Sequence, residues 1–283
     1  MIQDRRSGTA ERVAMRRAAH QLWDEPVIFP DPLAWAILSD EARERIRTGI
    51  EEENGNPWAR GLRAFIAVRS RFAEEEIAKA AERGVRQAVI LGAGLDTFGY
   101  RNPHAELQVF EVDHPATQAW KQERLRNGEI GIPESVRFAP VDFERDTLAH
   151  GLAAAGFRED EPAFFSWLGV VPYLSREAAF GTLGFIATLP PKSGVVFDYA
   201  IPRERMSEQE QLAFDRLAER VARAGEPFRL LLDPEQLAHD LLEMGFTAVE
   251  DLDGAAIRER WFGQPRLEQR LHGRAGRLLC ARV

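Results

Sequence analysis

The residues best suited to bind a ligand are a pair of glycines and a carboxylate that follows them by roughly 20 residues. Gln87–Leu91 is a short apolar run, and Gly92 and Gly94 come directly after it. Glycine turns the chain tightly and lets a ligand approach the backbone with no Cβ in the way. A second apolar run, Leu107–Val112, ends in Asp113, at the spacing of a carboxylate that contacts a nucleotide ribose. The pattern predicts a cradle for an adenosine-containing ligand.

The glycine turn alone does not identify the nucleotide. A dinucleotide-binding fingerprint has a third glycine three residues after the second, and this chain has Thr97 there. Asp96 lies just past the first predicted strand, and Asp142 lies at the end of the third. With Asp113 they would line the carboxyl edge of a parallel sheet, which is where such sheets bind ligands.

Strands and helices alternate along the chain and must position these residues. Predicted strands cover 87–91, 107–113, 136–143, 163–168, 195–199, 246–252 and 277–283. Predicted helices cover 10–23, 32–38, 58–83, 115–127, 146–155, 175–187, 207–224 and 234–244. This alternation predicts an α/β fold with a mostly parallel seven-stranded sheet and helices on both faces.

We expect a single domain, because 283 residues suit one large α/β unit with an appendage. Its parts would be a helical cap over 1–80, a cofactor-binding core over 85–200, a helical insertion or lid over 201–232, and the C-terminal part of the sheet over 233–283.

Composition narrows the partners. The net charge of −8 argues against general binding to nucleic acid or anionic membrane. No apolar run approaches the roughly 18 residues of a membrane span, and no apolar segment follows the basic N-terminus as in a secretory signal. Cys280 is the only cysteine, so an intrachain disulfide is impossible. We expect a cytoplasmic protein without a metal site, because the six histidines show no metal-ligand spacing. The oligomeric state is not indicated.

Several segments resemble the leucine carboxyl methyltransferase family, over roughly residues 60 to 283. The strongest are Val-Ile-Leu-Gly-Ala-Gly-Leu-Asp-Thr at 89–97 and Phe-Glu-Val-Asp-His-Pro at 110–115. Gly-Val-Val-Pro-Tyr-Leu at 169–174 and Phe-Asp-Tyr at 197–199 agree with them. The family is a branch of the class I S-adenosylmethionine-dependent methyltransferases that includes bacterial polyketide carboxyl O-methyltransferases. The resemblance implies a Rossmann-like methyltransferase fold, S-adenosyl-L-methionine as cofactor, and a carboxylate of a small molecule or peptide as acceptor.

The resemblance also assigns the methionyl part of the cofactor to particular residues. Gly92, Ala93 and Gly94 would form the turn beneath it, and Arg69 would hold its carboxylate. A guanidinium suits a carboxylate because it can bind in bidentate fashion. Arg71 is a rival for this role, and either arginine could instead extend from its helix toward solvent.

The adenosine part is assigned in the same way. Asp113 would accept the ribose hydroxyls, and His114 would lie near the adenine. Asp142 and Phe143 match an acid–apolar pair that contacts the adenine amino group and ring. Simpler interpretations remain for two of them: His114 as a structural histidine beside Pro115, and Asp142 as a cap of the following helix.

The chain departs from the family at two positions. Leu168 replaces a glutamate that often begins the segment before Tyr173, and Phe98 stands where arginine is frequent. Tyr173 and Tyr199 are the candidates for the acceptor side, although both could be half-buried structural tyrosines.

Methyl transfer to a carboxylate needs no base, whereas transfer to a hydroxyl does, and the sequence offers no convincing base. Two other functions stay open. One is a nicotinamide-dinucleotide oxidoreductase, against which Thr97 counts. The other is a non-catalytic cofactor-binding module. This alternative stays open because Leu168 stands where the family often has a glutamate.

Overall fold

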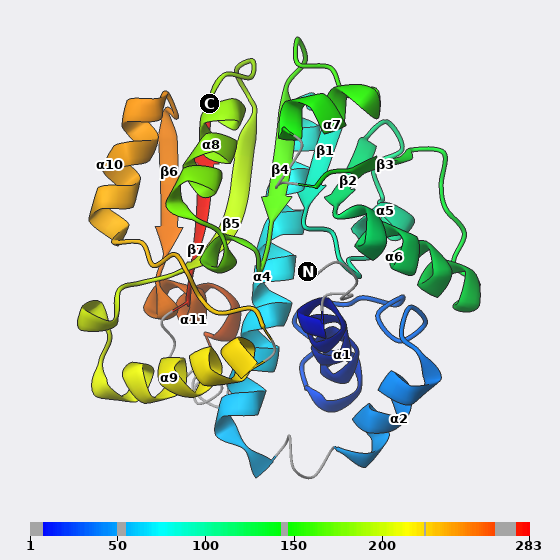
Figure 1. Cartoon of the computed structure of the whole chain (residues 1–283), viewed down its shortest axis with the longest axis vertical. Helices are drawn as coiled ribbons and strands as arrows, with labels where there is room; N and C mark the ends of the chain where they lie inside the picture. Colours follow the sequence, from blue (N-terminus) through cyan, green and yellow to red (C-terminus); the bar gives the residue numbers. More distant parts are fainter. Residues whose placement is uncertain (1–7, 50–54, 143–146, 224, 264–275) are drawn as a thin grey trace.

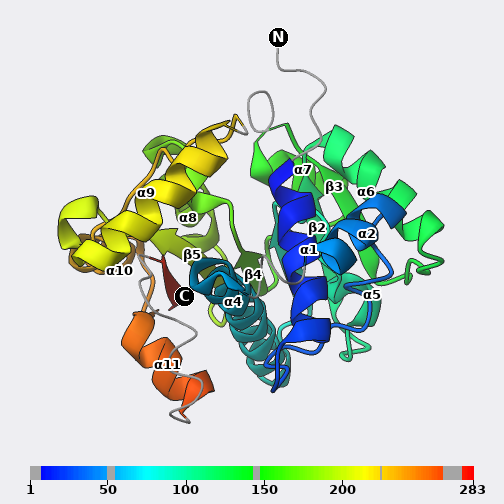
Figure 2. The same cartoon turned by 90° about the horizontal axis from the view of Figure 1, so that it is seen from below.

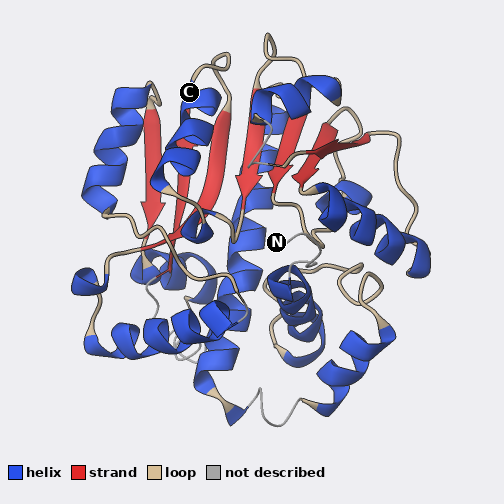
Figure 3. Ribbon diagram, in the orientation of Figure 1, coloured by secondary structure: helices blue, strands red, loops and turns tan. Residues whose placement is uncertain are grey.

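The computed structural model describes residues 8–49, 55–142, 147–223, 225–263 and 276–283. Its strands are β1 (Gln87–Leu91), β2 (Gln108–Asp113), β3 (Val136–Pro140), β4 (Ala163–Trp167), β5 (Gly194–Ala200), β6 (Ala248–Leu252) and β7 (Gly276–Arg282). They form one sheet in the order β3-β2-β1-β4-β5-β7-β6 (Figure 3). Only β7 runs against its neighbours, β5 and β6. The predicted mostly parallel seven-stranded α/β fold is confirmed.

The described helices are α1 (Gly8–Trp23), α2 (Asp40–Thr48), α4 (Pro57–Glu82), α5 (Phe98–Arg101), α6 (Pro115–Asn127), α7 (Leu148–Ala154), α8 (Arg176–Ala187), α9 (Glu208–Arg223), α10 (Pro234–Met244) and α11 (Gly254–Phe262). The helix predicted over 32–38 is wrong, because these residues form successive turns. The Asp31 side chain accepts a hydrogen bond from Leu33 N, and the same carboxylate contacts Arg17, so the segment is shaped by tertiary partners. The helices α2, α5 and α11 were not predicted.

The central strand β1 is buried on both faces, as its continuous apolar run predicted. Ile90 packs with Phe72 and Ile77 of α4 in one apolar cluster. Its neighbour Leu91 points to the other face, where it joins Leu183 of α8 in a second cluster. Successive side chains of a strand point to opposite faces, so one short strand anchors both layers of helices (Figure 1).

A third apolar cluster joins α1, α2 and the 31–38 turns to α6, with Ala18, Ile37, Ile46 and Trp120 among its members. Seen along the sheet in Figure 2, α1 and α9 lie on opposite sides of α4. The helix α4 runs from this group of helices onto the sheet, where it contacts β4 and β5. The division into a cap, a core, a lid and a C-terminal part stays a prediction. Asn56 begins α4 by accepting hydrogen bonds from Trp58 N and Ala59 N.

A buried charged network lies behind the end of β2. Glu111 Oε1 is 2.7 Å from Lys121 Nζ, and Tyr100 donates a hydrogen bond to Glu111 Oε2 at 2.8 Å. Burial raises the pKa of Glu111, while Lys121 and Tyr100 oppose that shift. The network ties β2 to α5 and α6, and it fixes the strand that ends in Asp113.

We expect Lys121→Met to lower the free energy of unfolding by about 3–5 kcal/mol, because it leaves the Glu111 carboxylate buried without its cation. Lys121 opposes the rise in the pKa of Glu111, so its removal should raise that pKa further in the folded state, and the loss should grow as the pH rises from about 5 to about 8. Urea denaturation at both pH values measures it. Arg158→Gln, at an exposed ion pair with Asp160, is the control and should change stability far less. An equally small effect of both substitutions would contradict the assignment.

Candidate functional site

The glycine turn after β1 presents bare backbone. Gly92 and Gly94 have φ angles of 63° and 45°, in the left-handed region that favours glycine. A Cβ on Gly92 would lie 2.4 Å from Val170 Cγ2, so a larger residue would displace the loop after β4. The turn is held to β2 by a 3.0 Å hydrogen bond from Ala93 N to Val112 O.

Asp113 ends β2 and faces this turn. Its Oδ2 accepts a 2.6 Å hydrogen bond from Gly94 N, and its Oδ1 accepts one of 2.7 Å from His114 N. Burial raises the pKa of Asp113, and the two backbone donors oppose the shift. A carboxylate oxygen can accept more than one hydrogen bond, so Asp113 can hold the turn and still accept from a ligand.

These residues line a cavity of about 500 Å³ at the carboxyl ends of the parallel strands, called here the glycine-turn cavity. The lining includes these predicted binding residues: Arg69, Gly92, Ala93, Gly94, Asp113, His114 and Asp142. Phe143 lies outside the described residues. Among the described residues no group of histidine, cysteine and carboxylate side chains could hold a metal ion.

His114 has a local structural partner as well as its place in the cavity wall. It stands at the start of α6, and its Nδ1 accepts a 3.2 Å hydrogen bond from Ala116 N. The geometry agrees with the simpler interpretation of a helix cap beside Pro115, and its predicted place near an adenine stays a prediction.

Arg69 on α4 forms a buried ion pair with Asp198 on β5, with 2.8 Å between Nη1 and Oδ2. Asp198 also accepts a hydrogen bond from Gly169 N. A Cβ on Gly169 would lie 2.8 Å from Arg69 Nη2, so glycine leaves room for the guanidinium. Arg69 Nε is buried without a hydrogen-bond partner among the described residues. The rival Arg71 lies at the surface, bonded to Glu75.

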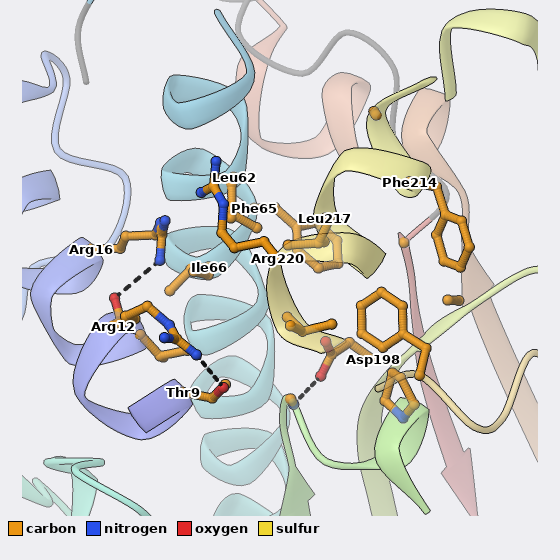
Figure 4. A pocket seen from close by; sticks show the side chains of 18 of the residues that line it. Thr9, Arg12, Arg16, Leu62, Phe65, Ile66, Asp198, Phe214, Leu217 and Arg220 are labelled. Carbon is orange, nitrogen blue, oxygen red and sulfur yellow. Dashed lines mark hydrogen bonds between the residues drawn. The ribbon is translucent and has the colours of Figure 1, made fainter. Parts of the chain in front are cut away.

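A second cavity of about 240 Å³ lies between α1, α4 and α9 and is called here the arginine-rich cavity (Figure 4). Its wall and that of the glycine-turn cavity share five residues: Thr9, Val13, Arg69, Gly169 and Tyr173. The two cavities therefore meet where Arg69 and Tyr173 stand. Such adjoining cavities can hold two reactants next to each other.

The two acceptor-side candidates occupy different positions. Tyr173 lines both cavities, and its ring packs 5.3 Å from that of Phe228. Burial raises the pKa of Tyr173 to about 12, so its hydroxyl is a proton donor at neutral pH. Tyr199 lines only the arginine-rich cavity of the two, and its hydroxyl donates a 2.6 Å hydrogen bond to Asp251.

Sequence reasoning did not place Arg17, Asp198 or Glu226 at the site. Asp113 was identified because it is an acid at the carboxyl end of a predicted parallel strand. Asp198 lies near the carboxyl end of β5, so the same criterion could have identified it. Arg17 donates to the carbonyl of Leu95 just after the glycine turn, and Glu226 accepts a hydrogen bond from Thr9. These contacts join segments far apart in the sequence and have no local pattern.

Leu168 lines the glycine-turn cavity at the position where the family often has glutamate. Gly169, the residue after Leu168, donates a hydrogen bond to the Asp198 carboxylate.

No described helix is long and apolar enough to cross a bilayer.

Comparisons with known proteins agree with this geometry. The profile of the leucine carboxyl methyltransferase family matches residues 10–187. A Bacillus subtilis protein named "Putative S-adenosyl-L-methionine-dependent methyltransferase YktD" is 30% identical, over 88% of this chain and 89% of its own. A Mycobacterium sp. (strain JLS) protein named "Putative S-adenosyl-L-methionine-dependent methyltransferase" is 35% identical, over 73% of this chain and 71% of its own.

Among solved structures, a duf574 family protein from Streptomyces avermitilis superposes with a TM-score of 0.53 at 16% identity, covering 96% of each chain. That likeness shows the fold. The sequence matches also show the family and the cofactor, and they favour a methyltransferase over the nicotinamide-dependent oxidoreductase. The chain belongs to the leucine carboxyl methyltransferase family and is an S-adenosyl-L-methionine-dependent methyltransferase.

Proposed function

We propose that this methyltransferase O-methylates a carboxylate of a small molecule or peptide. The observation that carries the proposal is the set of residues shared by the two cavities. Among the described residues, that set contains the hydrogen-bond donors Arg69 and Tyr173 and contains no histidine or carboxylate. The carboxylates beside it are already engaged, because Asp198 accepts from Arg69 and Gly169, and Glu226 accepts from Thr9. A carboxylate acceptor needs no base, so this junction suits it better than it suits a hydroxyl.

The glycine-turn cavity suits S-adenosyl-L-methionine. Its turn has no Cβ where a ligand would approach, and a carboxylate stands at the end of β2 as a ribose contact requires. When bound, the cofactor supplies an electrophilic methyl group. We assign the ribose hydroxyls to Asp113, the methionyl carboxylate to Arg69, the turn beneath it to Gly92, Ala93 and Gly94, and the adenine surroundings to His114 and Asp142.

The chain's own contribution to the reaction is to bind and orient. Arg69 is held by Asp198, so its guanidinium has a fixed position at the junction. Tyr173 can donate a hydrogen bond to an acceptor oxygen and thereby orient it. The segment after α9 closes on α1 through Glu226 and Thr9, and this contact restricts water at the junction.

An acceptor screen with methyl-labelled S-adenosylmethionine tests the proposal. Carboxylic acids should accept label that mild base releases, because methyl esters hydrolyse and methyl ethers do not. Label found only in base-stable products would contradict carboxylate methylation. Turnover of any acceptor would exclude a non-catalytic module.

Asp113→Ala should weaken S-adenosylhomocysteine binding about ten- to a hundredfold. This loss of affinity corresponds to the free energy of one hydrogen bond to a charged group. Calorimetric titration measures this loss. A thermal melt of the variant serves as the folding control, because Asp113 also holds the glycine turn. Unchanged affinity in a folded variant would remove the ribose assignment.

Arg69 and Arg71 are two residues apart in α4, so they lie on different faces of the helix and provide a matched pair. Arg69→Gln should weaken S-adenosylhomocysteine binding at least about tenfold, because it removes the cation proposed for the methionyl carboxylate. Arg71→Gln, which disturbs only the surface contacts to Glu75 and Ile28, should leave the affinity unchanged. The opposite ranking would transfer the role to Arg71.

The pH dependence distinguishes the acceptor types. A carboxylate acceptor is ionised above about pH 6. Tyr173 stays protonated well past neutrality because burial raises its pKa to about 12. We therefore expect kcat/KM to be flat between about pH 6 and pH 9. A tenfold rise per pH unit across that range would indicate deprotonation of a hydroxyl acceptor instead.

A further inference from the structure

The arginine-rich cavity extends well beyond the junction with the glycine-turn cavity. On α4 its lining residues recur at three- and four-residue spacing and so share one face: Trp58, Ala59, Leu62, Phe65, Ile66 and Arg69. From Trp58 to Arg69 the helix rises about 16 Å. The cavity wall thus runs along three turns of α4, from the first turn of the helix to the ion pair with Asp198.

The middle of this wall is apolar. Leu62, Phe65 and Ile66 of α4 face Phe214 and Leu217 of α9 across the cavity (Figure 4). Burial of hydrocarbon against such a surface is favourable and non-directional. An acceptor therefore fits here if its central part is an alkyl chain or a ring system.

The end of the cavity away from the glycine turn is positively charged. Arg216 and Arg220 lie four residues apart on α9, and both line the cavity. Arg216 lies over the ring of Trp58, 5.9 Å from its centroid, which places it at the first turn of α4. Figure 4 shows the Arg220 side chain extending from α9 toward Leu62 and Phe65 of α4.

These charges are not balanced within the cavity. Asp198 is the only acidic residue in the described lining, and it is paired with Arg69 at the opposite end. The Arg220 side chain makes no ion pair or hydrogen bond within the described part of the chain, and the Arg216 side chain contacts the neutral Trp58 ring. Arg12 and Arg16 of α1 add positive charge on the facing wall.

We propose that the acceptor carries two anionic groups separated by an apolar segment. One is the carboxylate that receives the methyl group beside Arg69 and Tyr173, and the other is a carboxylate or phosphate bound by Arg216 and Arg220. The proposal rests on the methyl transfer proposed above and adds a specificity site to it. Arginine suits both kinds of anion because its planar guanidinium donates paired hydrogen bonds.

Calorimetric titration of the S-adenosylhomocysteine-loaded protein with dodecanedioic acid, dodecanoic acid and its ω-hydroxy analogue tests this. The dicarboxylate should bind about tenfold or more tightly than either monocarboxylate, as expected for added hydrogen bonds to a charged group. The advantage should shrink at high salt, because both arginines are exposed at the cavity mouth. An ω-phosphono analogue that binds more tightly still would identify phosphate as the preferred second group.

Matched variants of α9 test whether Arg216 and Arg220 cause the tighter binding of the dicarboxylate. Arg216→Gln combined with Arg220→Gln should reduce the advantage of the dicarboxylate to less than about twofold and leave dodecanoic acid binding unchanged. Arg223→Gln is the control, because Arg223 lies on the same helix, bonds to Glu219 and does not line the cavity. It should preserve the full advantage.

The proposal is overturned if the dicarboxylate and dodecanoic acid bind equally, if none of the probes binds, or if the double variant weakens both acids alike. S-adenosylhomocysteine affinity, measured first on every variant, reports separately on the cofactor site. Selective binding of the dicarboxylate without methylation of any carboxylic acid would instead refute the proposed function and leave the specificity site standing.

Discussion

The buried pair between Arg69 and Asp198 is the contact on which the rest of the site depends. It joins the middle of α4 to the end of β5, and it lies where the two cavities meet. Removing two charges from water is costly unless each is paired and hydrogen-bonded. Here the second Asp198 oxygen accepts from Gly169 N, and the absence of a Cβ at Gly169 leaves space for the guanidinium. The pair thereby fixes helix, strand and loop relative to one another.

The two cavities are formed by different parts of the fold. The glycine-turn cavity uses backbone and strand ends, so its shape follows from the register of a rigid parallel sheet. The arginine-rich cavity is lined mostly by side chains of the helices α1, α4 and α9, with Asp198 and Tyr199 of β5 at its edge with the sheet. In the proposed assignment, cofactor binding depends on the rigid sheet, and acceptor choice depends on helices whose surfaces can differ without disturbing the sheet.

Much of the fold and part of the site could be predicted from the sequence. The apolar run before Gly92, the glycines and the terminal Asp113 are local patterns, because a buried strand, a bare turn and a strand-end acid each need only neighbouring residues. The helix predicted over 32–38 was wrong because residues distant in the sequence shape that segment, through contacts of Asp31 with Arg17 and Thr97. The short helices α2, α5 and α11 have few residues in which periodicity can show.

The sequence by itself determined the α/β class, the glycine cradle and its carboxylate, and the motifs that mark the family. Only the tertiary structure decided which of two neighbouring arginines faces the cavities, that Asp198 is its partner, and that Arg216 and Arg220 stand at the far end of an apolar channel. The physical reason is distance along the chain. Asp198 lies 129 residues from Arg69, and pairing across such a separation depends on how sheet and helices pack. Local patterns specify strands and turns, whereas the packing of α1, α4 and α9 creates the arginine-rich cavity.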